Sequence, residues 1–259
     1  MFYKKEIWRD WRVYYKLLFA VLIGYGIFAA LIESYVHGIT VTVKNPTWSE
    51  EATKNFINDK GDYTFNYFNY FSYFTIQINL LVFAWLLGAG LFPKYEGKNK
   101  WLGYNMTLAI TIYISITFLI FNLMLLPVEQ PQTWRAWLYS TIQHVICPIV
   151  MIVYFLFFME RENNIKTTKV YWRQDLWKFY FYPIVWTIVN MIRGEFRWQA
   201  GKAFPYQYFF LNVHKSLAGI PGVVWFIIAV IAIAGLVFGL GTLYNFCSYK
   251  FVNKKKIVK

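Results

Sequence analysis

Apolar residues occur in long continuous runs along this chain, separated by shorter polar segments. A helix needs roughly 20 such residues to cross a bilayer core of about 30 Å, because lipid offers no partner for unpaired backbone groups. The runs lack the period-two alternation that a transmembrane β-barrel requires. The pattern therefore predicts an all-α, polytopic membrane protein, a bundle of six transmembrane helices. The expected spans are residues 13–32, 70–92, 102–126, 137–159, 177–192 and 220–246, of which the fifth is the shortest and contains Pro183.

The composition supports this class. Hydrophobic residues make up 58% of the chain and charged residues only 15%, whereas soluble domains carry about 25% charged residues. This excludes a soluble globular domain and a disordered chain. The net charge of +13 would suggest nucleic acid in a soluble protein, but here the basic residues flank apolar runs. We therefore expect them to face lipid headgroups, and membrane lipids rather than nucleic acid to be the partners.

The basic flanks also predict the orientation. Most of the 26 Lys and Arg lie before the first run, in the second and fourth loops, and after the last run. Because basic loops are retained on the cytoplasmic side, both termini of this multi-pass cell-membrane protein are expected in the cytoplasm. The N-terminal flank contributes Lys4, Lys5, Arg9, Arg12 and Lys16.

The chain is expected to form one domain over residues 1–259, without internal repeats. The first run could be a signal peptide, but its length and the five runs that follow favour a retained anchor. Residues 33–69 form a long extracellular loop in this topology, either a solvated connector or a lid over an outer-leaflet site.

Polar residues within the spans are costly and mark packing or function. With a rise of about 1.5 Å per residue, Thr75 of the second span, His144 of the fourth, and Asn190 and Arg193 at the end of the fifth reach similar depths near the outer surface. Asn79 lies one turn deeper than Thr75, in the same leaflet. Four of them have a structural alternative: Thr75 can bond to its own helix, Asn79 and His144 can bridge helices, and Arg193 can be an interface anchor.

A proline follows the intramembrane histidine. Pro148 has no N–H, so it leaves the carbonyl of His144 without its helical partner and bends the helix there. A bent helix beside a polar side chain suits a cavity.

No other pattern indicates a cofactor, a metal or a nucleotide. His37 and His214 fall in outer loops, while Cys147 and Cys247 lie in different apolar runs, where they are expected as small buried residues. The sequence has no metal-ligand spacing and no phosphate-binding loop.

Several short segments resemble the prokaryotic six-transmembrane family, which is similar to the eukaryotic androgen-induced and androgen-dependent membrane hydrolases. They are YFTIQINLL at 73–81, HVICP at 144–148, Arg193-Gly194, FPY at 204–206 and FLN at 210–212. The resemblance extends from the second span to the sixth, but each motif is short and mostly apolar. It implies that Thr75 and His144 are a catalytic pair that cleaves fatty-acyl esters. The long 33–69 segment departs from the compact connection of the hydrolases, and differences around Asn212 put a role for that residue in doubt.

Such a pair requires the His144 imidazole to remove the proton of the Thr75 hydroxyl. No Asp or Glu occurs within the apolar body of a span to orient the histidine, and Glu33, at the end of the first, is not assigned. Gln143, Asn79 or a backbone carbonyl would have to take that place. The competing hypothesis is a non-catalytic membrane protein, a transporter or a lipid-binding scaffold, in which Thr75 and His144 only hold helices together. The sequence shows neither the inverted repeat of many transporters nor the charge ring of a channel.

Overall fold

A computed structural model describes residues 9–36, 63–127, 130–131, 133–161, 165–202 and 205–257. These residues form helices joined by short connections, and an isolated bridge joins Leu217 and Ile220. The longer helices are α1 (Trp11–Val36), α3 (Tyr63–Ser72), α4 (Phe74–Leu91), α5 (Tyr104–Ile120), α6 (Trp134–Thr141), α7 (Cys147–Val153), α8 (Thr168–Gln174), α9 (Lys178–Gln199) and α10 (Gly222–Ile257). Short pieces are η2 (Pro93–Tyr95) and η6 (Phe209–Leu211), and three π-helical segments are η3 (Phe121–Leu125), η4 (Ile142–Ile146) and η5 (Tyr154–Phe158).

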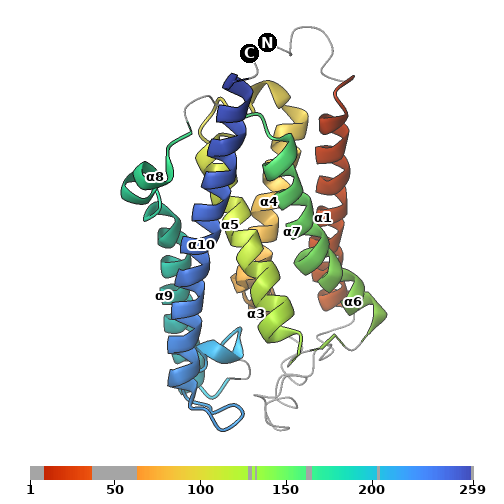
Figure 1. The fold of residues 1–259 in the computed structure, drawn as a ribbon. Coiled ribbons are helices and arrows are strands. Elements are labelled where there is room, and N and C mark those ends of the chain that lie inside the picture. The colour runs from red at the N-terminus through yellow and green to blue at the C-terminus, as the bar shows by residue number, and fades with distance from the viewer. Residues whose placement is uncertain are drawn as a thin grey trace.

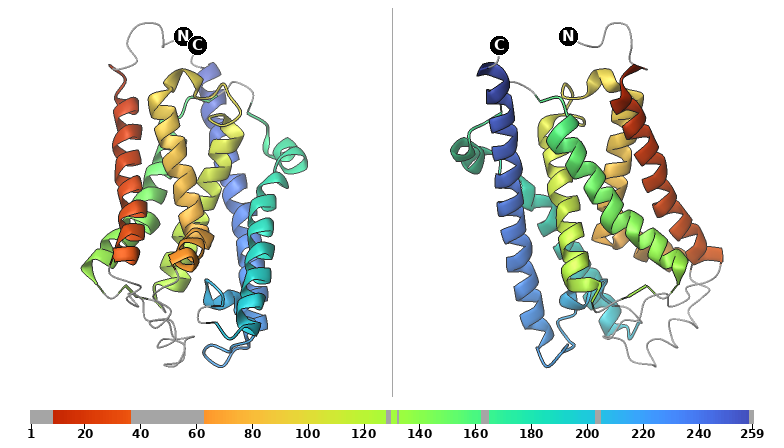
Figure 2. Two further views of the ribbon diagram at one scale, coloured as in Figure 1. Left: turned by 180° about the vertical axis from the view of Figure 1, so that it is seen from behind. Right: turned by 45° about the vertical axis from the view of Figure 1, so that its right-hand side comes forward.

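The helices run side by side along one axis (Figure 1). The start of α1 and the end of α10 lie at one end, which we call the terminal end. The opposite end carries α3, α6 and η6 and is called the distal end. In Figure 2 the continuous rod from α6 through η5 crosses the bundle obliquely between α1 and α5, while α9 lies beside α10.

Five helical rods are long and apolar enough to cross a membrane, which confirms an all-α membrane protein among the described residues. They are Trp11–Glu33, Phe74–Leu91, Tyr104–Leu125, Trp134–Phe158 and Gly222–Asn253. The fifth expected span, residues 177–192, forms α9 but does not meet this criterion. The count of six spans and the cytoplasmic location of the termini therefore stay predictions.

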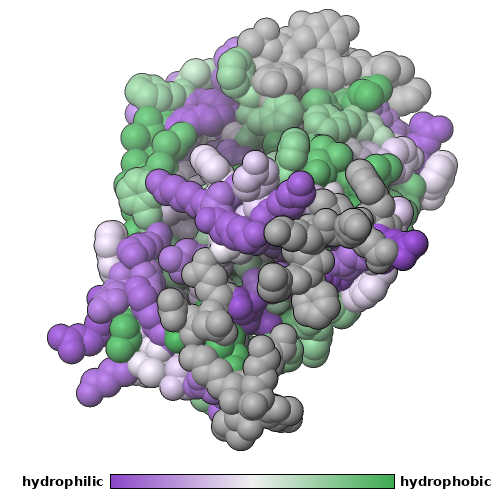
Figure 3. Space-filling model, turned by 90° about the horizontal axis from the view of Figure 1, so that it is seen from above, coloured by the Kyte–Doolittle hydropathy of each residue, from purple (hydrophilic) through white to green (hydrophobic). Residues whose placement is uncertain are grey.

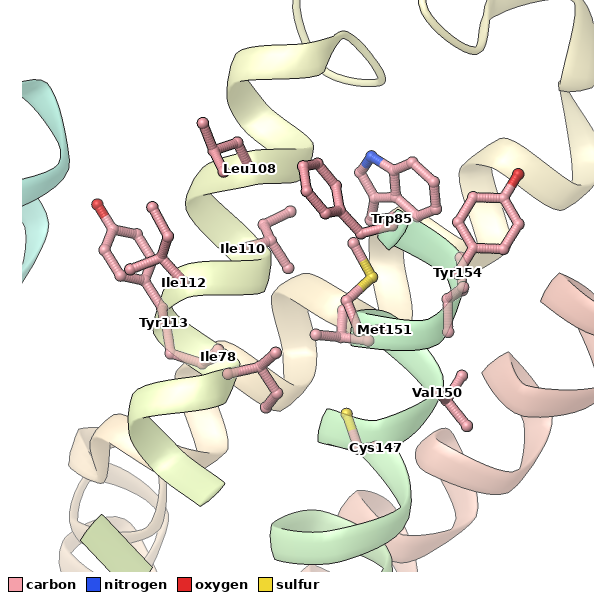
Figure 4. Packing of buried hydrophobic residues seen from close by; sticks show 14 of the residues in the cluster. Ile78, Trp85, Leu108, Ile110, Ile112, Tyr113, Cys147, Val150, Met151 and Tyr154 are labelled. Carbon is pink, nitrogen blue, oxygen red and sulfur yellow. The ribbon is translucent and has the colours of Figure 1, made fainter. Parts of the chain in front are cut away.

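The core forms around α5. This helix is buried on nearly all sides, and its threonines and its serine donate to carbonyls one turn earlier, so their hydroxyl groups are satisfied within the helix. Figure 4 shows Ile110 of α5 on the side of that helix that faces Met151 of α7. By contrast, α1, α9 and α10 expose many large apolar side chains, as expected for helices that face lipid.

Hydrophilic side chains are prominent at the terminal end, seen from above in Figure 3.

One basic residue of the N-terminal flank does not face the headgroups, in contrast to the prediction from the sequence. The side chain of Lys16, a residue of α1, is fully buried. Its Nζ lies 2.6 Å from Oε2 of Glu96, and the Tyr154 hydroxyl donates to Oε1 of Glu96 at 2.5 Å. The three side chains form an ionic cluster that joins α1, the η2 loop and η5.

A second acidic residue at this end holds the turn between α8 and α9. The Nζ atoms of Lys166 and Lys178 each lie 2.6 Å from one carboxylate oxygen of Asp175. Burial opposes ionisation of Asp175, but the hydrogen bonds and positive charges of the two lysines outweigh it and hold its pKa below the usual range.

We expect Asp175→Asn to lower the thermal unfolding temperature at pH 7 and to have a smaller effect at acidic pH. A carboxyl with a lowered folded pKa stabilises the fold above its unfolded value of about 3.9, and this is lost as the pH falls through the folded pKa. The effect is modest, about 0.2–1 kcal/mol per pair, because both lysines are partly exposed. Unfolding of the detergent-solubilised protein at pH 7 and pH 3 measures it, and equal differences at the two pH values would contradict the prediction.

Candidate functional site

The second expected span, residues 70–92, is interrupted near the distal end. Tyr73 is extended, with φ −66° and ψ 132°, and separates α3 from α4. Side chains from neighbouring helices satisfy carbonyls at the end of α3: Gln77 Nε2 donates to Phe71 at 2.8 Å and Trp186 Nε1 to Ser72 at 3.0 Å. The N-terminus of α4 therefore begins inside the bundle.

Thr75 is the second residue of α4 and is buried. Its Oγ1 lies 3.4 Å from the Tyr208 hydroxyl, and its N–H lies 3.5 Å from the same oxygen. Both distances are longer than a typical hydrogen bond. Tyr73, at the N-cap, provides no capping hydrogen bond. At the positive end of the helix dipole, the Thr75 N–H can thus donate a shorter hydrogen bond to another acceptor, and the Thr75 hydroxyl can form a shorter hydrogen bond with another partner.

Asn79 connects the turn of α4 that carries Thr75 to η4. Its Nδ2 donates to the carbonyl of Thr75 at 2.9 Å and to the carbonyl of Gln143 at 3.1 Å. Gln143 precedes His144 in η4, and its own amide nitrogen donates to the Gly26 carbonyl at 2.9 Å. The backbone turns that carry Thr75 and His144 therefore lie next to each other at the same level of the bundle.

The His144 ring is held in a defined orientation. It stacks on Phe121 with ring centres 3.5 Å apart, and Nδ1 lies 2.9 Å from the Ser140 carbonyl and 3.2 Å from the Ser140 hydroxyl. Since a carbonyl only accepts, we assign the ring proton to Nδ1, which leaves Nε2 as the basic nitrogen. A backbone carbonyl thus orients the imidazole. Within the described part of the chain, no hydrogen bond joins the Thr75 hydroxyl to the His144 ring.

The helix around His144 is π-helical, a form that is frequent at functional sites. Asn122 Nδ2 donates to the Phe118 carbonyl at 2.7 Å and lies 3.4 Å from the His144 carbonyl, which Pro148 deprives of its usual helical donor. The sequence predicted that the His144 carbonyl lacks its helical donor, but it did not predict Asn122 as the neighbouring donor.

Asn190 and Arg193 make contacts away from this pair. Asn190 Nδ2 donates to the Trp186 carbonyl at 2.9 Å. The Arg193 guanidinium donates to Asn69 Oδ1 at 2.8 Å and to the Pro205 carbonyl at 3.4 Å, so it clamps α3 and the chain after α9 to α9. Neither side chain forms a hydrogen bond with Thr75 or His144 in the described structure.

The segment after α9 packs into the distal end, a feature that the sequence did not reveal. Residues 206–212 are all buried, and a side chain at Gly194 would overlap the ring of Tyr206, so α9 approaches this segment closely. Tyr208 thereby reaches Thr75, and Gln207 Nε2 lies 2.6 Å from Ser72 Oγ. The aromatic residues at 204–210 were the sequence signal for a buried segment. They have no periodicity from which the path of the chain could be predicted.

Other polar residues of the distal end form hydrogen bonds with one another. His214 stacks on Trp198 and its Nε2 lies 2.7 Å from Glu195. Hydrogen bonds from His214, Gln199 and Tyr206 lower the pKa of Glu195. Asn212 Oδ1 accepts from the His214 N–H at 3.3 Å, which is a turn contact. His37 lies outside the described residues.

The structure also describes the two cysteines and Glu33. Cys147 is buried, as expected, whereas Cys247 is only half-buried. Glu33 forms a long ion pair with Arg135, at 3.5 Å. The described residues contain no group of three or more His, Cys, Asp or Glu side chains that could hold a metal ion.

Comparisons with protein-family models, with curated proteins and with solved structures find no match.

Proposed function

We propose that this integral membrane protein hydrolyses acyl esters of lipids at its distal end, with Thr75 as the nucleophile and His144 as the general base. The observation that carries the proposal is the position of Thr75 in the first turn of α4, buried and without a capping side chain. A nucleophile there has its own N–H and the helix dipole directed at the oxygen that becomes negative during ester cleavage.

In the first half of the reaction, His144 Nε2 takes the proton of the Thr75 hydroxyl as Oγ1 attacks the ester carbonyl carbon. The Thr75 N–H stabilises the resulting oxyanion. When the tetrahedral intermediate collapses, the bond to the alcohol oxygen breaks and the imidazolium returns the proton to the leaving alcohol. An acyl-threonine remains.

In the second half, water attacks the acyl-threonine while His144 accepts its proton. The Thr75 oxygen leaves and recovers a proton from the imidazolium, and a fatty acid is released. Each half requires Nε2 within about 2.6–3.2 Å of the reacting oxygen, a distance that catalytic groups often reach only with substrate bound. The Ser140 carbonyl stabilises the imidazolium in place of the missing carboxylate.

Two further observations support the proposal. Asn79 bonds both the Thr75 carbonyl and the Gln143 carbonyl, so the two catalytic turns are fixed relative to each other. The resemblance to the membrane threonine hydrolases assigns the same two residues. A substrate with its acyl chain in the bilayer would present its ester near this level.

The test uses purified protein in detergent with a panel of acyl esters and a fluorophosphonate probe. Thr75→Val, which keeps the shape but removes the hydroxyl, and His144→Gln are expected to lower turnover by about 100-fold or more. Thr75→Ser should retain turnover and labelling. Thr111→Val is the matched control, because the Thr111 hydroxyl is also buried but donates only to the Thr107 carbonyl of α5. Wild-type protein that neither turns over esters nor is labelled would overturn the proposal, as would equal labelling of Thr75→Val.

A non-catalytic lipid-binding function is the second candidate. It is favoured by one observation, the contact of the Thr75 hydroxyl with Tyr208 and not with His144. In that case Thr75→Val and Tyr208→Phe change thermal stability without any effect on labelling.

A further inference from the structure

Among the described residues, three buried amide oxygens of α4, α9 and the segment after α9 have no hydrogen-bond partner: Asn79 Oδ1, Asn190 Oδ1 and Gln207 Oε1. Their residues are at most 4% exposed. The nitrogen of each amide fixes its orientation. Asn79 and Asn190 donate to carbonyls, which cannot donate in return. Ser72 uses its only hydrogen on the Asn69 carbonyl at 2.6 Å, so it must accept from Gln207. All three free atoms are therefore acceptors.

Contacts through Tyr208 connect the segments that carry the three amides. Tyr208 touches Thr75, one turn before Asn79 on α4, and its ring lies 5.9 Å from that of Trp186, one turn before Asn190 on α9. Gln207 is the neighbour of Tyr208. We call these three side chains the amide cluster.

An unsatisfied buried acceptor costs about 1–3 kcal/mol, and most buried polar groups find a partner. The other buried side-chain atoms without a partner among the described residues are Trp85 Nε1, Arg161 Nη1 and the Tyr171 hydroxyl, each able to donate. Acceptors without donors thus accumulate in the segments that Tyr208 connects. A group that donates hydrogen bonds is missing from these segments.

The surroundings restrict the charge of that group. Phosphate oxygens are also acceptors, so the amide oxygens would repel an anionic headgroup. An ammonium group would require a carboxylate nearby to offset its desolvation. Glu195, the carboxylate on α9 beside the segment after this helix, is already bonded to His214, Tyr206 and Gln199. A neutral hydroxyl group fits both conditions.

We propose that the amide cluster binds the hydroxyl groups of a neutral polyol, so that the substrate is an acyl ester of an alcohol such as glycerol. This inference rests on the proposed hydrolase function for its assignment as a substrate site. Water fills the acceptors when no lipid is bound, and the hydroxyls of the polyol replace that water while the ester carbonyl reaches Thr75.

The first experiment compares a monoacylglycerol with the ethyl ester of the same fatty acid. Two hydrogen bonds of ordinary strength should raise kcat/KM for the monoacylglycerol by about tenfold. Asn190→Leu and Gln207→Leu should reduce this ratio toward one. Asn245→Leu should keep the ratio, because Asn245 lies in the C-terminal half of α10, which ends at the terminal end, and its amide oxygen already accepts from Tyr104. Equal kcat/KM values in wild type would overturn the inference and leave the hydrolase proposal intact.

The second experiment measures binding without turnover. A hexadecyl glyceryl ether, which cannot be hydrolysed, should raise the thermal unfolding temperature of wild type more than hexadecyl methyl ether does. The difference should vanish in Asn190→Leu. If this result is obtained without hydrolysis of any ester, the ligand class stands and the hydrolase proposal fails. Equal shifts by the two ethers would show that the acceptors hold only water, which would overturn the inference.

Discussion

Glu96→Gln is expected to lower the free energy of unfolding by about 3–5 kcal/mol, the usual cost of removing one partner from a buried ion pair. The glutamine keeps the size of the side chain and can still accept from Tyr154. It leaves the Lys16 ammonium, which is 0% exposed, without a counter-charge in the interior of the bundle. Lys16→Met should be destabilising in the same way, because it leaves the Glu96 carboxylate unpaired except for the tyrosine.

The double variant Lys16→Met with Glu96→Gln distinguishes this mechanism from a simple loss of packing. With both charges removed, no desolvated ion remains, so most of the stability should return. Lys98→Met, an exposed residue of the same loop, is the control and should change stability by less than about 0.5 kcal/mol. Thermal and denaturant unfolding in one detergent measures all four proteins. A double variant that loses the sum of the single losses would contradict the prediction.

The case of Lys16 shows what a hydrophobic pattern can and cannot indicate. Counting basic residues near a span predicts orientation but treats each lysine as facing headgroups. The helical register of α1 held a further signal, because Val13, Ala20, Ile23 and Ile27 form the buried face and Lys16 lies on it. The partner could not be predicted, since Glu96 is 80 residues away and sits in a loop.

The spans themselves could be predicted because lipid requires a continuous apolar run for each crossing. The interruption at Tyr73 could not, because no Gly or Pro marks it. It exists because Gln77 and Trp186, the second from a distant helix, satisfy the carbonyls that the break releases. Tertiary contacts of this kind have no periodic signature.

The candidate site could likewise be predicted only in part. Helical spacing placed Thr75 and Asn79 on one face and gave His144 a matching depth, and Asn79 indeed links the two turns. The contact with Tyr208 depends on the fold of residues 205–212, which pack against α4 and α9 by aromatic contacts. A catalytic contact between Thr75 and His144 stays a prediction.

Gly222→Ala is expected to lower the free energy of unfolding by about 3 kcal/mol, at the upper end of the cost of overpacking. Gly222 is the first residue of α10, and a Cβ there would lie 2.6 Å from the Lys215 carbonyl oxygen and closer still to that of Asn212. These are backbone atoms, so they cannot rotate away as a side chain could. The chain from residue 205 to 215 would have to shift, and with it Gln207 and Tyr208.

The matched control lies in the same helix. Gly235 has open space around its Cβ position, so Gly235→Ala should leave stability unchanged or raise it by about 0.5–1 kcal/mol through reduced backbone freedom. The thermal unfolding temperature should therefore fall in Gly222→Ala and stay the same or rise in Gly235→Ala. Because the shift displaces Tyr208 from Thr75, Gly222→Ala should also reduce fluorophosphonate labelling at temperatures where the protein is still folded. Equal stability of the two alanine variants would show that the loop at 212–215 yields without cost.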